Sequence, residues 1–253
     1  MQVTVAKLKK TRLTVLSVNL VYFLAVLALG FLIFVKDLGG WMYGLVAAAL
    51  VLYFAVVRPT TARYKRAVRE ALLRENVCRG CKDFTYDPKK GFTSQEFGAT
   101  GLMPGDAGKA FLSRELVTAR QGDRRLRMAD VTFPVKVDGL NAMFSGMLLE
   151  ICSEDREFPE LRLDGENWYT EPVNADARQA LDDLKARGGQ LLLQSRGRTL
   201  YLLVRGSFLG FPVNPLLNVT EKTMEAELLP EVRGALRVSQ TLCGQGRDKK
   251  GKR

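Results

Sequence analysis

Two uncharged apolar runs, separated by three residues, take up most of the first 57 positions of the chain. The first run is Leu13–Val35 with 23 residues, and the second is Gly39–Val57 with 19 residues. A helix of about 20 residues crosses the hydrocarbon core of a bilayer, so each run is long enough for one span. The intervening Lys36–Leu38 leaves room only for a tight turn. The sequence therefore predicts a transmembrane helical hairpin over residues 13–57.

The charges flanking this hairpin predict its orientation. Residues 1–12 carry a net charge of +4 and residues 58–82 carry +6, whereas Lys36 and Asp37 between the runs cancel. Basic residues favour the cytoplasmic side, so we expect both the N-terminus and the C-terminal domain in the cytoplasm, below a membrane crossed twice. Trp41 and Tyr43 are amphipathic aromatics at one end of the second run and are predicted interface anchors.

The remaining charge argues against a nucleic-acid partner. The chain has 253 residues and a net charge of +11, but outside residues 1–12, 58–82 and 247–253 the net charge is −3. A nucleic-acid binder carries its basic surface on the folded domain. We therefore expect a bilayer with an anionic inner leaflet as the partner of the basic segments, a disordered basic tail over 244–253, and no nucleic acid.

The segment 58–82 is predicted to leave the membrane as a basic amphipathic helix. Pro59 suits a first helical turn, and Thr60 or Thr61 is a candidate cap. Two interpretations stay open for its apolar face, which is either laid on anionic lipid or packed against the following domain. The residues expected to contact the membrane surface are Arg58, Arg63, Lys65, Arg66 and Arg69.

Residues 83–243 have the pattern of an α+β domain with a mainly antiparallel sheet and flanking helices. Candidate strands are 125–128, 131–137, 144–151, 161–163 and 168–170, and "QLLLQSRGRTLYLLVRGS" reads as a hairpin turning near Gly197. Helices are predicted over 175–187 and 221–242. The run "GDAGKAF" lacks the spacing and hydroxyl of a phosphate-binding loop, and we interpret it as a turn entering a strand with Phe111 and Leu112 packed inward.

One stretch of this domain resembles a known family. The segment "FTYDPKKGFTSQEFGATGLMP" is similar to the opening of the bacterial domain-of-unknown-function 3137 family, with its features at Tyr86, Pro88, Gly91, Glu96, Phe97, Thr100, Gly101 and Leu102. The resemblance covers residues 60–242 in order of elements and implies two N-terminal membrane spans. It implies no activity and no catalytic residues.

Cys78 and Cys81 form the one close cysteine pair and are weak candidates for a metal or thiol site. A zinc site needs two further ligands, and the chain has no histidine and only two other, distant cysteines. The pair also follows the C-terminal end of a helix, where the helix dipole disfavours a thiolate. We predict no catalytic residues, no metal and no cofactor, and hence no enzyme.

The leading hypothesis is an integral membrane protein that presents its α+β domain as a protein-interaction or scaffolding module. Self-association through the apolar faces of 59–77 and 221–242 is a further expectation. One alternative is a membrane-tethered thiol redox or metal-binding protein that uses Cys78 and Cys81. Another is a small subunit of a transport or secretion complex, in which Gly44 and the alanines after it would contact foreign helices.

Overall fold

The computed structural model describes most of the helices and strands of the chain. The residues described are 2–36, 42–76, 81–102, 110–137, 140–164, 167–170, 191–206, 209–210, 213–216 and 237–239, together with Gln179, Asp182, Gly234 and Thr241. Contacts divide the chain into two compact units. The helical unit comprises Met1–Leu72 and Pro212–Ala226, and the sheet unit comprises Leu73–Phe211 and Glu227–Arg253.

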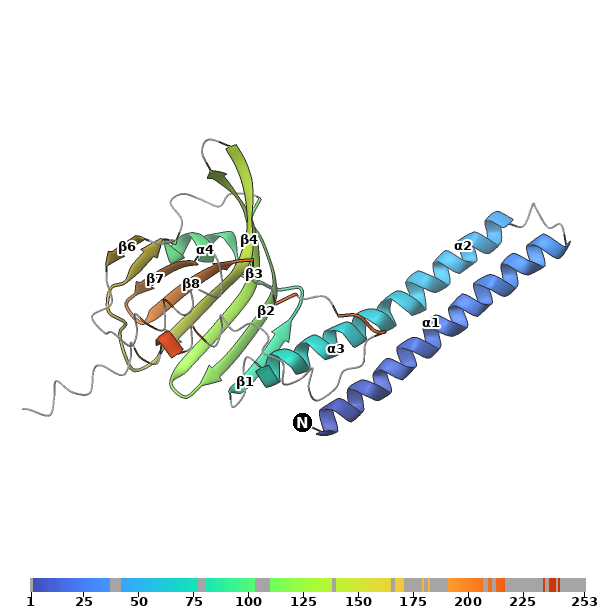
Figure 1. Ribbon diagram of the computed structural model, residues 1–253, viewed down its shortest axis with the longest axis horizontal. Coiled ribbons are helices and arrows are strands. Elements are labelled where there is room, and N and C mark those ends of the chain that lie inside the picture. Colours follow the sequence, from blue (N-terminus) through green and yellow to red (C-terminus); the bar gives the residue numbers. More distant parts are fainter. Residues whose placement is uncertain are drawn as a thin grey trace, which may run out of the picture. The chain divides into compact units, whose positions relative to one another are not determined.

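The helical unit is a two-helix hairpin. Helix α1 spans Gln2–Lys36, and the returning helix is made of α2 (Met42–Leu52), the π-helical turn η2 (Tyr53–Val57) and α3 (Arg58–Asn76). Figure 1 shows α1 antiparallel to and beside this returning helix. The basic N-terminal segment is thus helical from its second residue and continuous with the first apolar run.

Both helices are long and apolar enough to cross a membrane. Large apolar side chains along the two runs are exposed, among them Leu20, Phe31 and Phe34 of α1 and Phe54 of η2. Exposure of so much contiguous apolar surface is unfavourable in water and favourable in lipid. At the seam the Tyr22 hydroxyl donates to the Ala49 carbonyl at 3.2 Å. The predicted helical hairpin is therefore present.

The cap predicted at the start of the basic helix is wrong. The helix continues through Pro59 without a break, and the Thr60 hydroxyl donates to the Val56 carbonyl at 2.6 Å. Proline has no N–H and its ring crowds the carbonyl four residues earlier, so a wider turn before it relieves the clash. That turn is η2, which closes with the Arg58 N–H bonded to the Tyr53 carbonyl.

The apolar face of α3 is packed inside the protein. Tyr64, Val68 and Leu72 are buried, and Leu73 joins the core of the sheet unit. Protein therefore covers these side chains, and the placement of the helix on lipid or against the following domain stays a prediction. The contact of Arg58, Arg63, Lys65, Arg66 and Arg69 of α3 with a membrane surface stays a prediction.

The sheet unit is built on one antiparallel sheet, which confirms the predicted α+β class. Its strand order is β1-β2-β3-β4-β8-β7-β5-β6. The strands are β1 (Lys82–Asp87), β2 (Leu112–Gln121), β3 (Arg124–Val137), β4 (Leu140–Ser153), β5 (Arg162–Asp164), β6 (Asn167–Thr170), β7 (Leu191–Arg196) and β8 (Thr199–Arg205).

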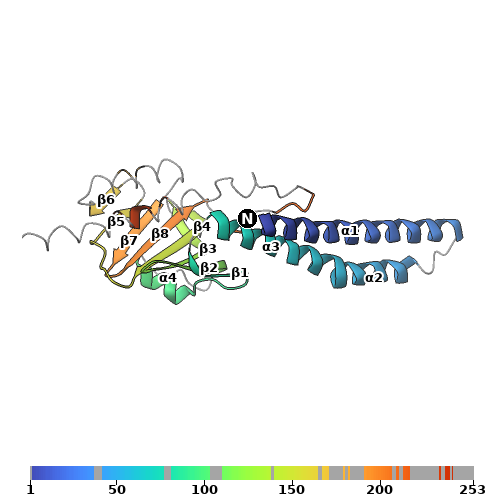
Figure 2. The ribbon, with the colours of Figure 1, turned by 90° about the horizontal axis from the view of Figure 1, so that it is seen from below.

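Both faces of the sheet bury apolar side chains. One face packs Leu126, Leu149 and Leu202 with Val238 from the C-terminal region. The other face carries helix α4 (Ser94–Thr100), whose Phe97 lies 4.7 Å from Phe133 between ring centroids. Figure 2 shows α4 against this second face, which we call the α4 face.

The predicted strands are recovered, with two of them merged. Segments 125–128 and 131–137 form the single strand β3, and the hairpin β7–β8 turns at Gly197 as predicted. The sequence missed β1, β2 and α4. Leu112 is exposed, so its inward packing was predicted wrongly. Helices 175–187 and 221–242, like the tail 244–253, lie largely or wholly outside the described residues.

Candidate functional site

A row of polar side chains crosses five strands on the α4 face, beyond the apolar residues that α4 covers. The register pairs Arg120 of β2 with Arg125 of β3, Arg125 with Cys152 of β4, Cys152 with Thr199 of β8, and Thr199 with Arg196 of β7. Residues opposite each other on neighbouring strands point to the same face. These five side chains therefore form one line, which we call the arginine row.

The arginine row is about 19 Å long, because neighbouring strands lie about 4.8 Å apart. Its three arginines are exposed, whereas Cys152 and Thr199 between them are half-buried. Arg120 pairs with Glu154, and Arg196 donates to the Ala99 carbonyl of α4 at 2.7 Å. Within the described part of the chain, Arg125 makes no hydrogen bond or ion pair.

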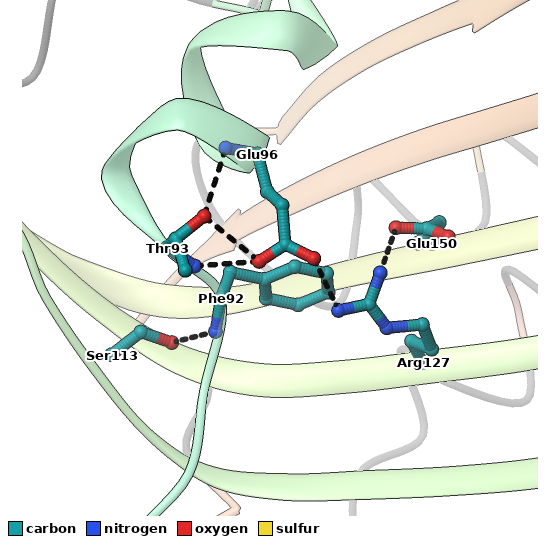
Figure 3. A network of polar contacts seen from close by, with 6 residues as sticks. All are labelled: Phe92, Thr93, Glu96, Ser113, Arg127 and Glu150. Atoms are coloured by element: carbon teal, nitrogen blue, oxygen red, sulfur yellow. Dashed lines mark hydrogen bonds and ion pairs between the residues drawn. The ribbon is translucent and has the colours of Figure 1, made fainter.

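A second row, parallel to the first, joins the polar surface to α4. It pairs Arg127 with Glu150, and Glu150 with Tyr201. The Arg127 guanidinium donates to Glu96 of α4 at 2.7 Å and to Glu150 at 3.3 Å (Figure 3). The guanidinium also lies 4.7 Å from the centre of the Phe92 ring. Arg127 therefore ties α4, the loop before it and two central strands together.

Local sequence places Glu96 in this position. Thr93 caps α4 by accepting the Glu96 N–H at 3.1 Å, and the Glu96 carboxylate accepts the Thr93 N–H at 2.7 Å. This is a capping box, which fixes the rotamer of the glutamate at the third helical position. One oxygen of Glu96 serves the cap and the other receives Arg127, as Figure 3 shows.

The residues of the family resemblance build this same region. Gly101 ends α4 in the left-handed conformation with φ 69°, and a Cβ there would lie 2.1 Å from the Arg196 guanidinium. A Cβ on Gly91 would collide with Ser113, whose hydroxyl accepts the Phe92 N–H at 3.0 Å. Both positions therefore require glycine, and packing alone accounts for the two glycines of the motif.

Burial and charge compete at the two glutamates that hold Arg127. Burial raises the pKa of Glu150 above its ordinary value, although the Arg127 charge opposes this effect. Burial also acts to raise the pKa of Glu96, but the Thr93 backbone and Arg127 outweigh it and the pKa of Glu96 is lowered. Burial, followed by the nearby Glu150 charge, raises the pKa of the Tyr201 hydroxyl.

The surface as a whole is basic. Arg162 of β5 lies opposite Gln194 of β7 and so shares the face of Arg196. With it, this surface carries five arginines against three glutamates among the described residues, namely Arg120, Arg125, Arg127, Arg162 and Arg196 against Glu96, Glu150 and Glu154. This local excess contrasts with the slightly negative charge of the domain sequence. An open row of guanidinium groups is suited to binding carboxylates, since each presents a planar fork of donors.

The residues singled out from the sequence lie elsewhere. Tyr43 is exposed at the end of the hairpin, whereas Trp41 and Cys78 lie outside the described residues. Cys81 is a half-buried cysteine directly before β1. In the ranges that the structure describes, no three metal-ligating side chains converge. Gly44 is exposed and a Cβ there would meet nothing within 4 Å, so it lies away from α1.

No known family matches the chain, and no curated protein or solved structure matches it either. Its function therefore has to be argued from the geometry of the two units.

Sequence reasoning missed the arginine row because its members are far apart in the chain. One signal was present: Thr93 and Glu96 have the spacing of a capping box. That spacing predicts α4 but not the partner of Glu96 on β3. The row itself emerges only from the register of five strands.

Proposed function

We propose that this protein is a membrane-anchored interaction module that binds an acidic segment of a partner protein through the arginine row. The hairpin α1–α2 would hold it in the bacterial cytoplasmic membrane, with the sheet unit in the cytoplasm. The proposal keeps the scaffolding role expected from the sequence and adds a surface and a partner chemistry to it.

The observation that carries the proposal is the exposed Arg125 in the middle of the row. Its guanidinium is next to a half-buried thiol and has no hydrogen-bonded partner in the described part of the sheet unit. Exposed arginines are common on surfaces, but Arg125 stands in one row with the exposed Arg120 and Arg196, which makes a directional array. Arg125 and Arg196 are three strands apart, which corresponds to about 14 Å.

An extended acidic peptide fits this spacing. Residues four apart on an extended chain are separated by about 13 Å and point to the same side. Two glutamates or aspartates at that separation would reach Arg125 and Arg196 together, and Thr199 between them offers a hydroxyl to the peptide backbone. Bidentate arginine–carboxylate pairs add geometric selectivity to the electrostatic attraction.

Resemblance to the domain-of-unknown-function 3137 family and the basic residues flanking the hairpin support the membrane topology. The positive charge at the N-terminal end of α1 and along α3 favours the cytoplasmic side for both helix ends. A tag at the C-terminus that can be labelled from outside intact cells would refute this orientation.

Crosslinking in native membranes tests the partner. We would compare the full-length protein with Arg125→Glu and with Lys89→Glu, which makes the same charge change at an exposed lysine in the turn after β1. Partners captured by the wild type and by Lys89→Glu, identified by mass spectrometry, should be lost with Arg125→Glu. Restoration by charge reversal in the partner segment would identify the contact. Equal capture by all three proteins would exclude the row as the binding surface.

A further inference from the structure

A short segment of the chain returns to the base of the hairpin and is held there by one arginine. We call residues 213–216 the strap; they belong to the helical unit. The Arg12 side chain of α1 donates through Nε to the Pro215 carbonyl at 2.9 Å and through Nη2 to the Leu216 carbonyl at 2.7 Å. The guanidinium fork thus binds two successive backbone carbonyls.

The strap alternates between an inner and an outer side. Val213 and Pro215 are half-buried, whereas Asn214 and Leu216 are exposed. The Asn214 side chain accepts the Leu216 N–H at 2.9 Å, which makes a local turn that fixes the backbone before the leucine. Leu216 is 71% exposed, so its side chain is open to a partner outside the strap.

Arg12 also stands at the start of the uncharged apolar run of α1. It directly precedes Leu13, the first residue of the uncharged run, whose side chain is exposed. On the returning helix, Arg58 directly follows the second run and lies 5.4 Å from the centre of the Phe54 ring. Arginines at the ends of membrane spans extend their guanidinium groups to the headgroup level.

These two observations fix the depth of Leu216. Its own carbonyl is bonded to the guanidinium of Arg12, so its exposed side chain lies within one side chain's length of the level at which the first span starts. We infer that the strap is a third membrane contact, in which Leu216 enters the interfacial region of the same bilayer. The inference rests on the proposed membrane anchoring of α1.

Leu216 is bonded to the arginine that directly precedes the exposed apolar run of α1, which is why lipid is the occupant we assign. Backbone carbonyls near the hydrocarbon region need donors, and the fork of Arg12 supplies two of them. The strap can therefore approach the bilayer with both carbonyls hydrogen-bonded, while the apolar side chain of Leu216 stays exposed.

Depth-dependent quenching in vesicles tests the inference on the full-length protein. An environment-sensitive fluorophore is attached to Leu216→Cys, and quenching by lipids spin-labelled near the headgroup is compared with quenching by aqueous iodide. Leu20→Cys, eight residues beyond Arg12 on α1, reports the hydrocarbon core. Ala6→Cys, six residues before Arg12 and exposed, reports the aqueous side. The background replaces Cys78, Cys81, Cys152 and Cys243 with serine.

We expect the probe at Leu216→Cys to be quenched by the headgroup-proximal spin label and protected from iodide, and the probe at Ala6→Cys to behave in the opposite way. Adding Arg12→Lys keeps the charge that orients the hairpin but removes the fork. The lipid quenching at position 216 should then fall to the level of the Ala6→Cys probe, with quenching at Leu20→Cys unchanged.

The outcomes separate this inference from the anchoring on which it depends. Lipid quenching at Leu20→Cys together with iodide quenching at Leu216→Cys would overturn the strap contact and leave the anchoring intact. Iodide quenching at Leu20→Cys would overturn both. Persistence of the lipid quenching at position 216 after Arg12→Lys would show that the fork does not set its depth.

Discussion

Replacing Arg127 with methionine should destabilise the sheet unit more strongly than a surface substitution does. Methionine preserves the apolar stem of the side chain but removes the guanidinium that joins Glu96, Glu150 and the Phe92 ring. The side chains of Arg127 and Glu150 are 25% and 15% exposed, so the removal leaves a carboxylate without its partner in a mostly dry position.

The magnitude follows from the separate contacts. A hydrogen bond to a charged, buried group contributes about 1.5–3 kcal/mol, which applies to Glu150. Glu96 is 40% exposed, so solvent screening reduces its ion pair to about 0.5 kcal/mol. The contact with the Phe92 ring adds about 0.5–1 kcal/mol. Methionine retains part of the packing, and we expect a total loss of about 2–4 kcal/mol at neutral pH.

The pH dependence distinguishes this mechanism from a simple packing defect. The pKa of Glu150 is raised in the folded state, so protonation of this carboxylate favours folding. The resulting contribution to the free energy of unfolding is fully present below pH 4.5, the ordinary pKa of a glutamate, and is lost as the pH rises through the pKa of the folded state. Without Arg127 that pKa rises further. Glu96 acts in the opposite sense. Its pKa is lowered in the folded state, so its ionised form stabilises the fold at pH values above the ordinary pKa of a glutamate, and the variant loses part of this stabilisation as well.

Because of both effects, the difference in free energy of unfolding between the variant and the wild type should be small near about pH 4 and larger near about pH 7.5. The assay is urea unfolding of the full-length protein in micelles. The chain has two tryptophans, so Trp41→Phe leaves Trp168 of β6 as the single reporter of the sheet unit. Adding Glu150→Gln to the variant should restore part of the lost stability. A loss under about 1 kcal/mol, or one independent of pH, would refute the reasoning.

Three further predictions use the same assay. Thr93→Ala should lower the free energy of unfolding by about 1 kcal/mol, because it removes the cap of α4, whereas Thr93→Ser should change it little. Gly146→Ala should cost about 2–3 kcal/mol, because the added Cβ would lie 2.1 Å from the Val204 carbonyl oxygen; Gly98→Ala meets nothing within 4 Å and should be neutral or stabilising. Asp130→Ala should cost about 2 kcal/mol, since its carboxylate accepts two backbone amides of the loop after β8 at 2.6 and 2.9 Å. Unchanged stability of Thr93→Ala, Gly146→Ala or Asp130→Ala would contradict the contact on which that prediction rests.

The hairpin was predictable from sequence because one property, uninterrupted hydrophobicity, determines it. The nearly continuous apolar runs of β4, β7 and β8 identified those strands for a related reason, since the centre of each strand is buried on both faces of the sheet. Strand β1 lacks this signal because it is a polar edge strand. The alternation of β2 is interrupted at Glu115, which has a positive φ of 61° and breaks the register.

The arginine row could not have been predicted from the chain alone. Arg120 and Arg125 are joined by a hairpin that the sequence did not reveal. Arg196 of β7 joins the same row only because β8 lies between β4 and β7 in the sheet. Pairings between distant strands leave little local trace, whereas caps and apolar periods are encoded within a few residues. The candidate site depends on pairings between distant strands, whereas the fold class depends on caps and apolar periods that a short stretch of sequence encodes.

The residues that carry the family resemblance and those that form the proposed binding surface have different tasks. Glu96 completes a cap and holds Arg127, and Gly101 leaves room for the Arg196 guanidinium; changing either disturbs the fold. Arg125 is exposed and contributes no hydrogen bond within the described residues, so the fold places little constraint on it. Stability and partner choice are therefore separable on this face. A substitution at Arg125 should change which proteins are captured without a measurable change in unfolding, whereas one at Glu96 should change unfolding first.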